Sequence, residues 1–134
     1  MNAKEFFKHD RFATDAGIEL VEISRGYGKA QMTVNESHLN AGNTTQGGAL
    51  FTLADLALAA AANSYGTLAL SLTSNISFFR TSGPGDVLTA EARERFIHKR
   101  TGHYDVDITN QSGDLIASFS ATVFRKDNEL PFSL

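Results

Sequence analysis

A single carboxylate stands in the most apolar part of the sequence. Between residues 37 and 79, Asp55 is the only Asp, Glu, Lys or Arg in 43 positions. Burial in an apolar surrounding penalises the charged form of a carboxylate, which raises its pKa and makes it a stronger base. Asp55 is therefore a candidate general base or nucleophile in a site without bulk water. The alternative is a carboxylate that points at solvent or caps a nearby backbone group.

Two glycines precede this carboxylate at a spacing that suits acyl transfer. Gly47 and Gly48 open the apolar segment, and Gly48 lies seven residues, close to two helical turns, before Asp55. Free backbone N–H groups and the helix dipole at such a position can stabilise an oxyanion. An oxyanion donor and a carboxylate that face one space would form an acyl-transfer site. Paired glycines also serve packing alone, and Asn40 is a typical turn residue.

One long helix must hold these residues. Alanine and leucine dominate residues 46–65, which contain no proline, and this predicts a helix about 30 Å long that is buried nearly all round. Residues 2–13 predict one short amphipathic helix, capped by Asn2, whose apolar side carries Phe6, Phe7 and Phe12.

The remaining segments predict strands. Short β-like pieces, residues 18–24 and 29–34, come before the long helix, and residues 68–79 follow it as a long strand. Period-two alternation then gives three apolar faces: Leu88, Ala90, Ala92 and Phe96; Tyr104, Val106 and Ile108; Leu115, Ala117, Phe119, Ala121 and Val123. A sheet with one apolar face buries a long helix best when it curls around it. We therefore expect an α+β hot-dog fold, a central helix wrapped by a curved antiparallel sheet of five to six strands.

The composition of the chain excludes several classes of function. The 134 residues predict one domain, 1–134, and a net charge of -3 offers no basic face to nucleic acid. Without cysteine there is no disulfide and no thiolate metal site, and the four histidines lack paired-ligand spacing, so we expect no metal. The N-terminus is charged and the apolar run 49–62 is too short to cross a bilayer, so we expect a cytoplasmic protein without membrane contact.

Residues 38–66, "HLNAGNTTQGGALFTLADLALAAAANSYG", resemble the signature of the phenylacetate-degradation (PaaI-type) hot-dog acyl-CoA thioesterases. The likeness extends through "SNISFFRTSGPGDVLTAEARE" and "TGHYDVDITNQSGDLIASFSATVFRK", from about Ala13 to Lys126. It implies hydrolysis of an acyl-CoA thioester by a homodimer with shared active sites, and dimers that pair into tetramers. It also implies that no cofactor is needed, with coenzyme A present only as part of the substrate.

The resemblance assigns roles to individual residues. Asp55 would be the catalytic carboxylate, facing Asn40 and Gly47 of the other subunit. The Gly47 N–H would polarise the thioester carbonyl, and Asn40 would orient the water or the substrate. Substrate-binding positions would include Gly48, a hydroxyl at Ser71 or Thr73, and Arg80, with Lys99 and Arg100 as further cations for the phosphates of coenzyme A.

Gln46 departs from the family pattern, which has histidine before the two glycines. A neutral amide can donate a hydrogen bond to the carbonyl or the leaving sulfur, but it cannot take up or deliver a proton. We therefore retain a non-hydrolytic acyl-CoA-binding or regulatory protein as the alternative to a thioesterase. A hydratase is disfavoured because it pairs a histidine with the carboxylate, and a purely structural assembly protein would need no isolated carboxylate. Phe51, Tyr65, Phe78 and Phe79 could line a pocket for an aryl-acetyl or medium-length acyl group, or belong to the core.

Overall fold

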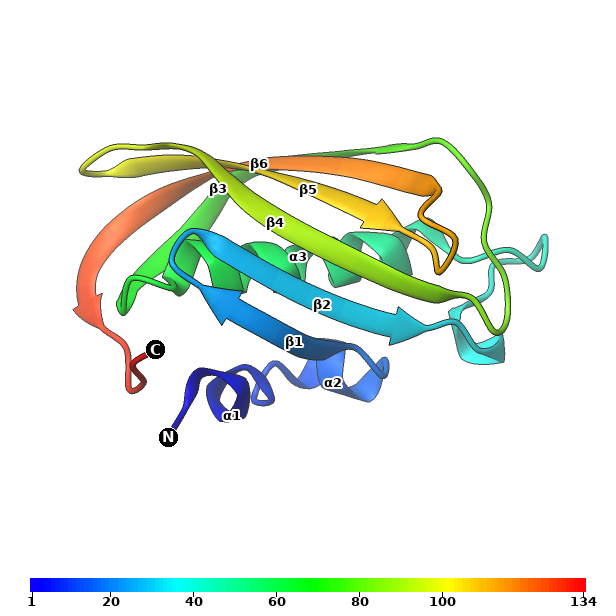
Figure 1. Cartoon of the computed structure of the whole chain (residues 1–134), viewed down its shortest axis with the longest axis horizontal. Helices are drawn as coiled ribbons and strands as arrows, with labels where there is room; N and C mark the ends of the chain where they lie inside the picture. The colour runs from blue at the N-terminus through cyan, green and yellow to red at the C-terminus, as the bar shows by residue number, and fades with distance from the viewer.

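A long helix lies against the concave face of a six-stranded sheet (Figure 1). The computed structural model describes residues 1–134. Every neighbouring strand pair is antiparallel, in the order β1-β2-β4-β5-β6-β3. The elements are α1 (Ala3–Phe7), α2 (Arg11–Asp15), β1 (Glu19–Ser24), β2 (Tyr27–Thr33), the short 3-10 helix η1 (Glu36–His38), α3 (Gly47–Asn63), β3 (Thr67–Phe78), β4 (Val87–Ile97), β5 (Thr101–Thr109) and β6 (Leu115–Glu129). The arrangement confirms the expected hot-dog fold, with six strands.

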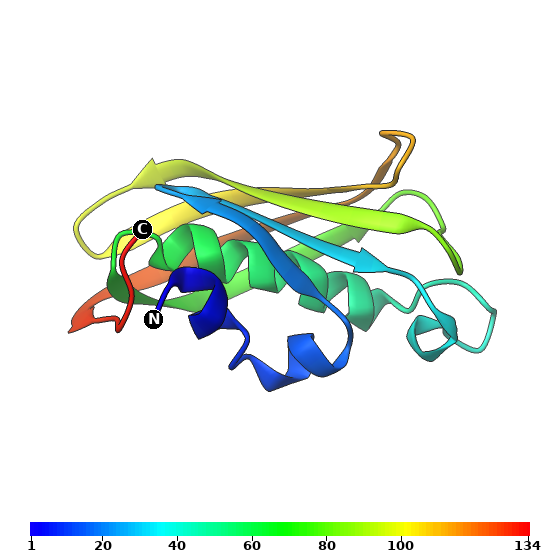
Figure 2. The same cartoon turned by 60° about the horizontal axis from the view of Figure 1, so that its bottom comes forward.

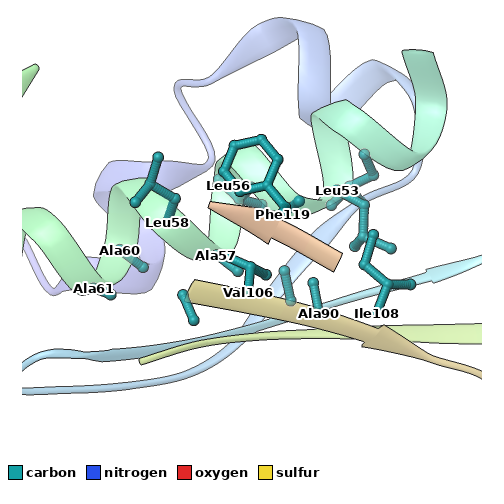
Figure 3. Packing of buried hydrophobic residues seen from close by; sticks show 14 of the residues in the cluster. Leu53, Leu56, Ala57, Leu58, Ala60, Ala61, Ala90, Val106, Ile108 and Phe119 are labelled. Carbon is teal, nitrogen blue, oxygen red and sulfur yellow. The ribbon is translucent and has the colours of Figure 1, made fainter. Parts of the chain in front are cut away.

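The core fills the space between α3 and the sheet. Figure 3 shows Leu53, Ala57 and Ala61 of the helix packed toward Val106 and Ile108 of β5, and all five side chains are at most 1% exposed. Small residues on this face of α3 let the strands approach the helix axis closely. The predicted inward faces of β4 and β5 are confirmed from residue 88 to 92 and from 104 to 108.

The N-terminal segment forms two short helices, so the expectation of one helix over residues 2–13 was wrong. Asn2 caps α1 as expected, because its side chain accepts the Glu5 N–H at 2.8 Å. Asp10 then adopts an extended backbone (φ -71°, ψ 92°), and its side chain accepts the Ala13 N–H to start α2. A second N-cap in the middle of the segment interrupts the helix. Phe12 consequently leaves the apolar side and is 75% exposed.

Two register shifts overturn predicted inward positions. Phe96 is 58% exposed because the ladder between β4 and β5 shifts between Glu94 and Phe96, which turns Phe96 to the outer face. Leu115 is 39% exposed, and its neighbour Ile116 is buried in its place, because the ladder also shifts between β5 and β6 at Ile108 and Thr109. Each extra residue reverses the alternation beyond it.

The strand β3 forms one edge of the sheet and carries exposed apolar side chains. It pairs only with β6, and Leu70 and Leu72 are 49% and 59% exposed. The two short helices lie on the side of α3 away from β5 and β6 (Figure 2). No helix provides an apolar stretch of the length that a membrane span requires.

Candidate active site

Asp55 lies on the one stripe of α3 that the sheet does not cover. Gly48, Thr52 and Asp55 are the exposed or half-buried members of this stripe, while the residues around them are mostly buried. The Asp55 carboxylate has no hydrogen bond and no ion pair in the protein. Burial, and after it the negative charge of Asp10, raises the pKa of Asp55. A carboxylate with a raised pKa and no partner has the electrostatics of a general base.

Two backbone N–H groups at the start of α3 are free. The first intrahelical bonds come from Ala49 and Leu50, both to the Gln46 carbonyl, while the N–H groups of Gly47 and Gly48 have no acceptor in the protein. Such groups, at the positive end of the helix dipole, can receive the oxygen of a polarised carbonyl. Both N–H groups are therefore available to a ligand, and their role as oxyanion donors stays a prediction.

Gln46 is the N-cap of α3. Its backbone is extended (φ -67°, ψ 138°), and its side-chain Oε1 accepts the Ala49 N–H at 3.2 Å. The helix therefore begins one residue later than expected, at Gly47, and ends at Asn63 rather than Tyr65. The capping role of Gln46 was not anticipated, because glutamine is seldom used at this position.

A network of backbone bonds holds the residues before the helix. The Gln46 N–H donates to the His38 carbonyl at 2.8 Å, and the Thr45 N–H donates to the Ser82 carbonyl at 3.0 Å. His38 is buried: its Nδ1 accepts the Asn35 N–H, which leaves Nε2 as the donor to the Ala16 carbonyl. Both ring nitrogens are used, so His38 has a structural role.

Asn40 holds its own loop together. Its Oδ1 accepts the N–H groups of Gly42 at 2.9 Å and Thr44 at 3.1 Å, and its Nδ2 donates to the Thr44 hydroxyl. One Nδ2 hydrogen is left for a further bond. The turn function is therefore present, while the orientation of water or substrate by Asn40 stays a prediction.

One chain does not bring the donors and the carboxylate together. Gly47 and Asp55 are eight residues apart on a straight helix, which corresponds to about 12 Å along its axis. A thioester carbonyl needs the donor within about 3 Å of its oxygen and the base within reach of the attacking water. The expectation that both groups of one helix face a single reacting centre is therefore wrong, and the centre requires another source for one of them.

A groove of about 530 Å³ runs beside the start of α3. Its walls come from α2, the loop after η1 and the exposed stripe of α3, and they include Phe12, Leu39, Gln46, Gly48, Phe51 and Thr52. A second groove, also of about 530 Å³, lies under α1 and β1 and reaches Leu56. Asp55 thus stands between Thr52 of the first groove and Leu56 of the second. The sequence did not reveal that Phe12 and Asp10 belong to this region, because no local pattern links residues 10–12 to the middle of α3.

The strand hydroxyls lie on opposite faces of β3. Ser71 pairs with the buried Val123 and shares its helix-facing side, whereas Thr73 pairs with Thr122 on the outer side, because the register shifts between them. Ser71 is therefore the hydroxyl that can face the space around α3.

The predicted cations differ in their availability. Arg80 follows β3 and is exposed, and its guanidinium makes no bond within the chain. Arg100 instead pairs with Asp127 at 2.9 Å and donates to the Arg125 carbonyl, so it is already engaged. Lys99 is exposed at the turn between β4 and β5. The role of these cations at the phosphates of coenzyme A stays a prediction.

The aromatic residues expected at an acyl pocket divide into two groups. The Phe78 ring lies against Gly47, since a Cβ on that glycine would come within 3.0 Å of the ring. Phe51 packs edge-on against the core residue Phe119, with ring centroids 5.1 Å apart, and it also lines the groove. Tyr65 lies beyond the opposite end of α3, where its hydroxyl donates to Glu94, so it is not part of the groove beside the helix start. Phe79 is exposed.

Comparison with known proteins identifies relatives of this chain. A family model described as the thioesterase superfamily matches residues 42–117. The acyl-coenzyme A thioesterase PaaI of Escherichia coli K12 is 39% identical over 118 residues, which cover 88% of this chain and 84% of that protein.

Solved structures agree with the sequence match. The structure of the E. coli PaaI protein from the phenylacetic acid degradation operon superposes with a TM-score of 0.91 at 37% identity, covering 96% of this chain and 93% of that one. A hypothetical thioesterase of Streptococcus pneumoniae TIGR4, solved with coenzyme A, superposes with a TM-score of 0.87 at 29% identity and covers 96% of this chain and 100% of that one.

Proposed function

Because this chain belongs to the thioesterase superfamily, we propose that it is an acyl-CoA thioesterase, which hydrolyses an acyl-CoA to a carboxylic acid and free coenzyme A. The observation that carries the proposal is the unpaired, half-buried Asp55 on the exposed stripe of α3, a carboxylate whose oxygens are free to take a proton. The similarity to the coenzyme A-bound streptococcal thioesterase supports acyl-CoA as the substrate class.

The chemistry needs one proton acceptor and one oxyanion donor. Asp55 either removes a proton from a water that attacks the carbonyl carbon, or attacks that carbon itself to give an anhydride that water then hydrolyses. In both routes the π electrons of the C=O bond move to the carbonyl oxygen, which accepts a hydrogen bond from the Gly47 N–H. Collapse of the intermediate breaks the C–S bond, and the departing thiolate takes up a proton to give the free thiol of coenzyme A.

A second copy of the chain supplies the missing half of the site. The edge strand β3 has a free side and exposed Leu70 and Leu72, so edge-to-edge pairing about a two-fold axis would continue the sheet and cover both leucines. Asp55 of one subunit would then face Asn40 and Gly47 of the other, and each dimer would hold two sites. Two such dimers would form a tetramer. Light scattering coupled to size-exclusion chromatography tests the assembly, and a monomer mass would contradict it.

The groove beside α3 favours an aryl-acetyl or medium-length acyl group. Phe12 and Phe51 line this groove together with Gly48, and Phe78 lies against Gly47. Such walls suit a flat or short apolar group close to the reacting carbonyl. Arg80, exposed and with no partner in the chain, is the cation that we assign to the phosphates of coenzyme A.

Thiol release from a panel of acyl-CoAs tests the function. The panel contains aryl-acetyl, benzoyl, short and long acyl thioesters, and the wild type is compared with Asp55→Asn and with the control Asp107→Asn. Asp107 lies exposed on the outer face of β5, away from α3. We expect Asp55→Asn to lower kcat by at least about 10²-fold, in the range for loss of a general base, and Asp107→Asn to leave it unchanged.

Two outcomes would contradict the proposal. Equal turnover by Asp55→Asn and wild type would remove Asp55 from the chemistry. Tight binding of acyl-CoA without turnover of any thioester would favour a non-hydrolytic acyl-CoA-binding protein.

A further inference from the structure

We infer that the amide NH₂ of Gln46 is a non-ionising hydrogen-bond donor to the thioester oxygen beside the Gly47 N–H. The inference rests on the proposed thioesterase function and concerns how this chain works without a histidine at that position. It follows from the way in which Gln46 caps α3.

The cap decides which end of the amide is free. Oε1 of Gln46 faces the Ala49 N–H at 3.2 Å, and only an oxygen can accept from that donor. Nε2 consequently points away from the backbone N–H and has no acceptor in the protein. Gln46 can thus offer a donor to a ligand, while its oxygen is engaged and cannot accept a proton from an attacking water.

The surrounding structure holds the backbone that carries this amide. The backbone of Gln46 is held by its N–H bond to the His38 carbonyl, and Thr45 is tied to Ser82 through both a backbone bond and a hydroxyl bond of 2.7 Å. Gly48 provides the room: a Cβ at this position would lie 2.6 Å from Oε1 and 3.4 Å from Nε2 of Gln46. The amide therefore lies over the first turn of the helix, against Gly48.

This placement has a chemical consequence. Negative charge develops on the carbonyl oxygen during attack, and a donor that is already oriented lowers the energy of that state without reorganisation. Because an amide does not titrate, it donates equally across the pH range, so no ionisation of residue 46 should enter the pH dependence of kcat. A histidine at position 46 would add an ionisation to the pH dependence of kcat, near the ordinary histidine pKa of about 6.5.

Gln46→Glu separates the donor from the cap. A carboxylate can still accept the Ala49 N–H and suits the positive end of the helix dipole, but it has no hydrogen to donate. We expect the melting temperature to stay within a few degrees of wild type and kcat to fall by about 10²-fold or more, the range for loss of one oxyanion donor. Gln46→His should recover part of the rate and add a pH-dependent limb. Gly48→Ala, which displaces the amide while retaining it, should lower kcat as well.

The outcomes distinguish this inference from the proposed function. If Asp55→Asn abolishes turnover while Gln46→Glu keeps kcat within 3-fold of wild type, the thioesterase assignment stands and Gln46 is only a cap. If the wild type turns over no thioester, the same variants are compared by calorimetry for binding a ketone analogue in which a methylene separates sulfur from the carbonyl. Weaker binding by Gln46→Glu, by about 10-fold or more, would retain the donor role, and equal binding would overturn it.

Discussion

The packing of β2 against α3 leaves no room for a side chain at Gly28, and Gly28→Ala should therefore destabilise the protein strongly. A Cβ at Gly28 would lie 2.9 Å from Ala60 Cβ and 3.0 Å from Ala61 N, and closer still to the Ala57 carbonyl oxygen. Two of these three atoms belong to the helix backbone, which cannot rotate away as a side chain would. Overpacking of a core costs about 1–3 kcal/mol, and a backbone clash belongs at the upper end. At about 4 °C for each kcal/mol in a domain of this size, a cost of about 3 kcal/mol lowers the melting temperature by about 12 °C.

Thermal unfolding followed by circular dichroism measures the effect, with Gly83→Ala as the matched control. A Cβ on Gly83 meets nothing within 4 Å, and its φ is not in the left-handed region, so this change should be neutral or stabilise by up to about 1 kcal/mol. Ala57 lies two residues from Asp55, so the displaced helix should also lower kcat in Gly28→Ala. A melting temperature within 2 °C of wild type would refute the reasoning that contact with the helix backbone excludes a side chain at position 28.

Three further predictions concern single side chains. Since burial raises the pKa of Asp55, the contribution of Asp55 to stability is present at low pH and is lost as the pH rises through that pKa. Asp55→Asn should therefore have a higher melting temperature than wild type at pH 7, and the difference should disappear below about pH 4. A difference in melting temperature that stays constant across pH would contradict this. Asp10→Asn keeps an N-cap but removes a negative charge that raises the pKa of Asp55, so the acid limb of kcat/KM should move to lower pH, whereas Asp15→Asn should leave it in place. Asn63 is buried and makes three hydrogen bonds to backbone groups, so Asn63→Ala should lower the free energy of unfolding in urea by about 1–3 kcal/mol. If Asn63→Ala and the control Asn128→Ala, at an exposed position, had equal free energies of unfolding, the bonds of Asn63 would be dispensable.

Most of the fold could be predicted because its periodicities are local. Alternation over each strand and an apolar helix of fixed length identify the elements, and one apolar face on each leaves few ways to combine them. The prediction that Phe96 points into the core was wrong because of contacts between segments that lie far apart in the sequence. The hydroxyls of Tyr65 and Tyr104 donate to Glu94 from 29 and 10 residues away, which keeps this carboxylate on the inner face beside the point where the register shifts. No pattern within β4 contains that information.

The site was predictable in residue type but not in detail. Asp55 and the glycine pair are visible in the sequence because one is an isolated charge and the other opens a helix. The cap formed by Gln46 depends on a side-chain rotamer. The proximity of Asp10 to Asp55 depends on how the N-terminal helices fold back over α3. The amino-acid composition specifies neither the rotamer of Gln46 nor the proximity of Asp10 to Asp55.

The contrast between Asp55 and the other partly or fully buried polar groups supports a functional reason for this residue. Each buried polar side chain in the chain has a partner: His38 bonds to two backbone groups, Asn63 to two residues, Ser64 to the Gly26 N–H and the Ala61 carbonyl, and Ser82 to Thr45. No buried side-chain nitrogen or oxygen lacks a hydrogen bond. Asp55 is half-buried in the most apolar helix and has no such partner, and the negative charge of Asp10 acts on it. A buried carboxylate kept for structure is usually paired, because hydrogen bonds and ion pairs offset part of the cost of its desolvation. An unpaired one keeps its oxygens free to take a proton, which is what the proposed reaction requires of it.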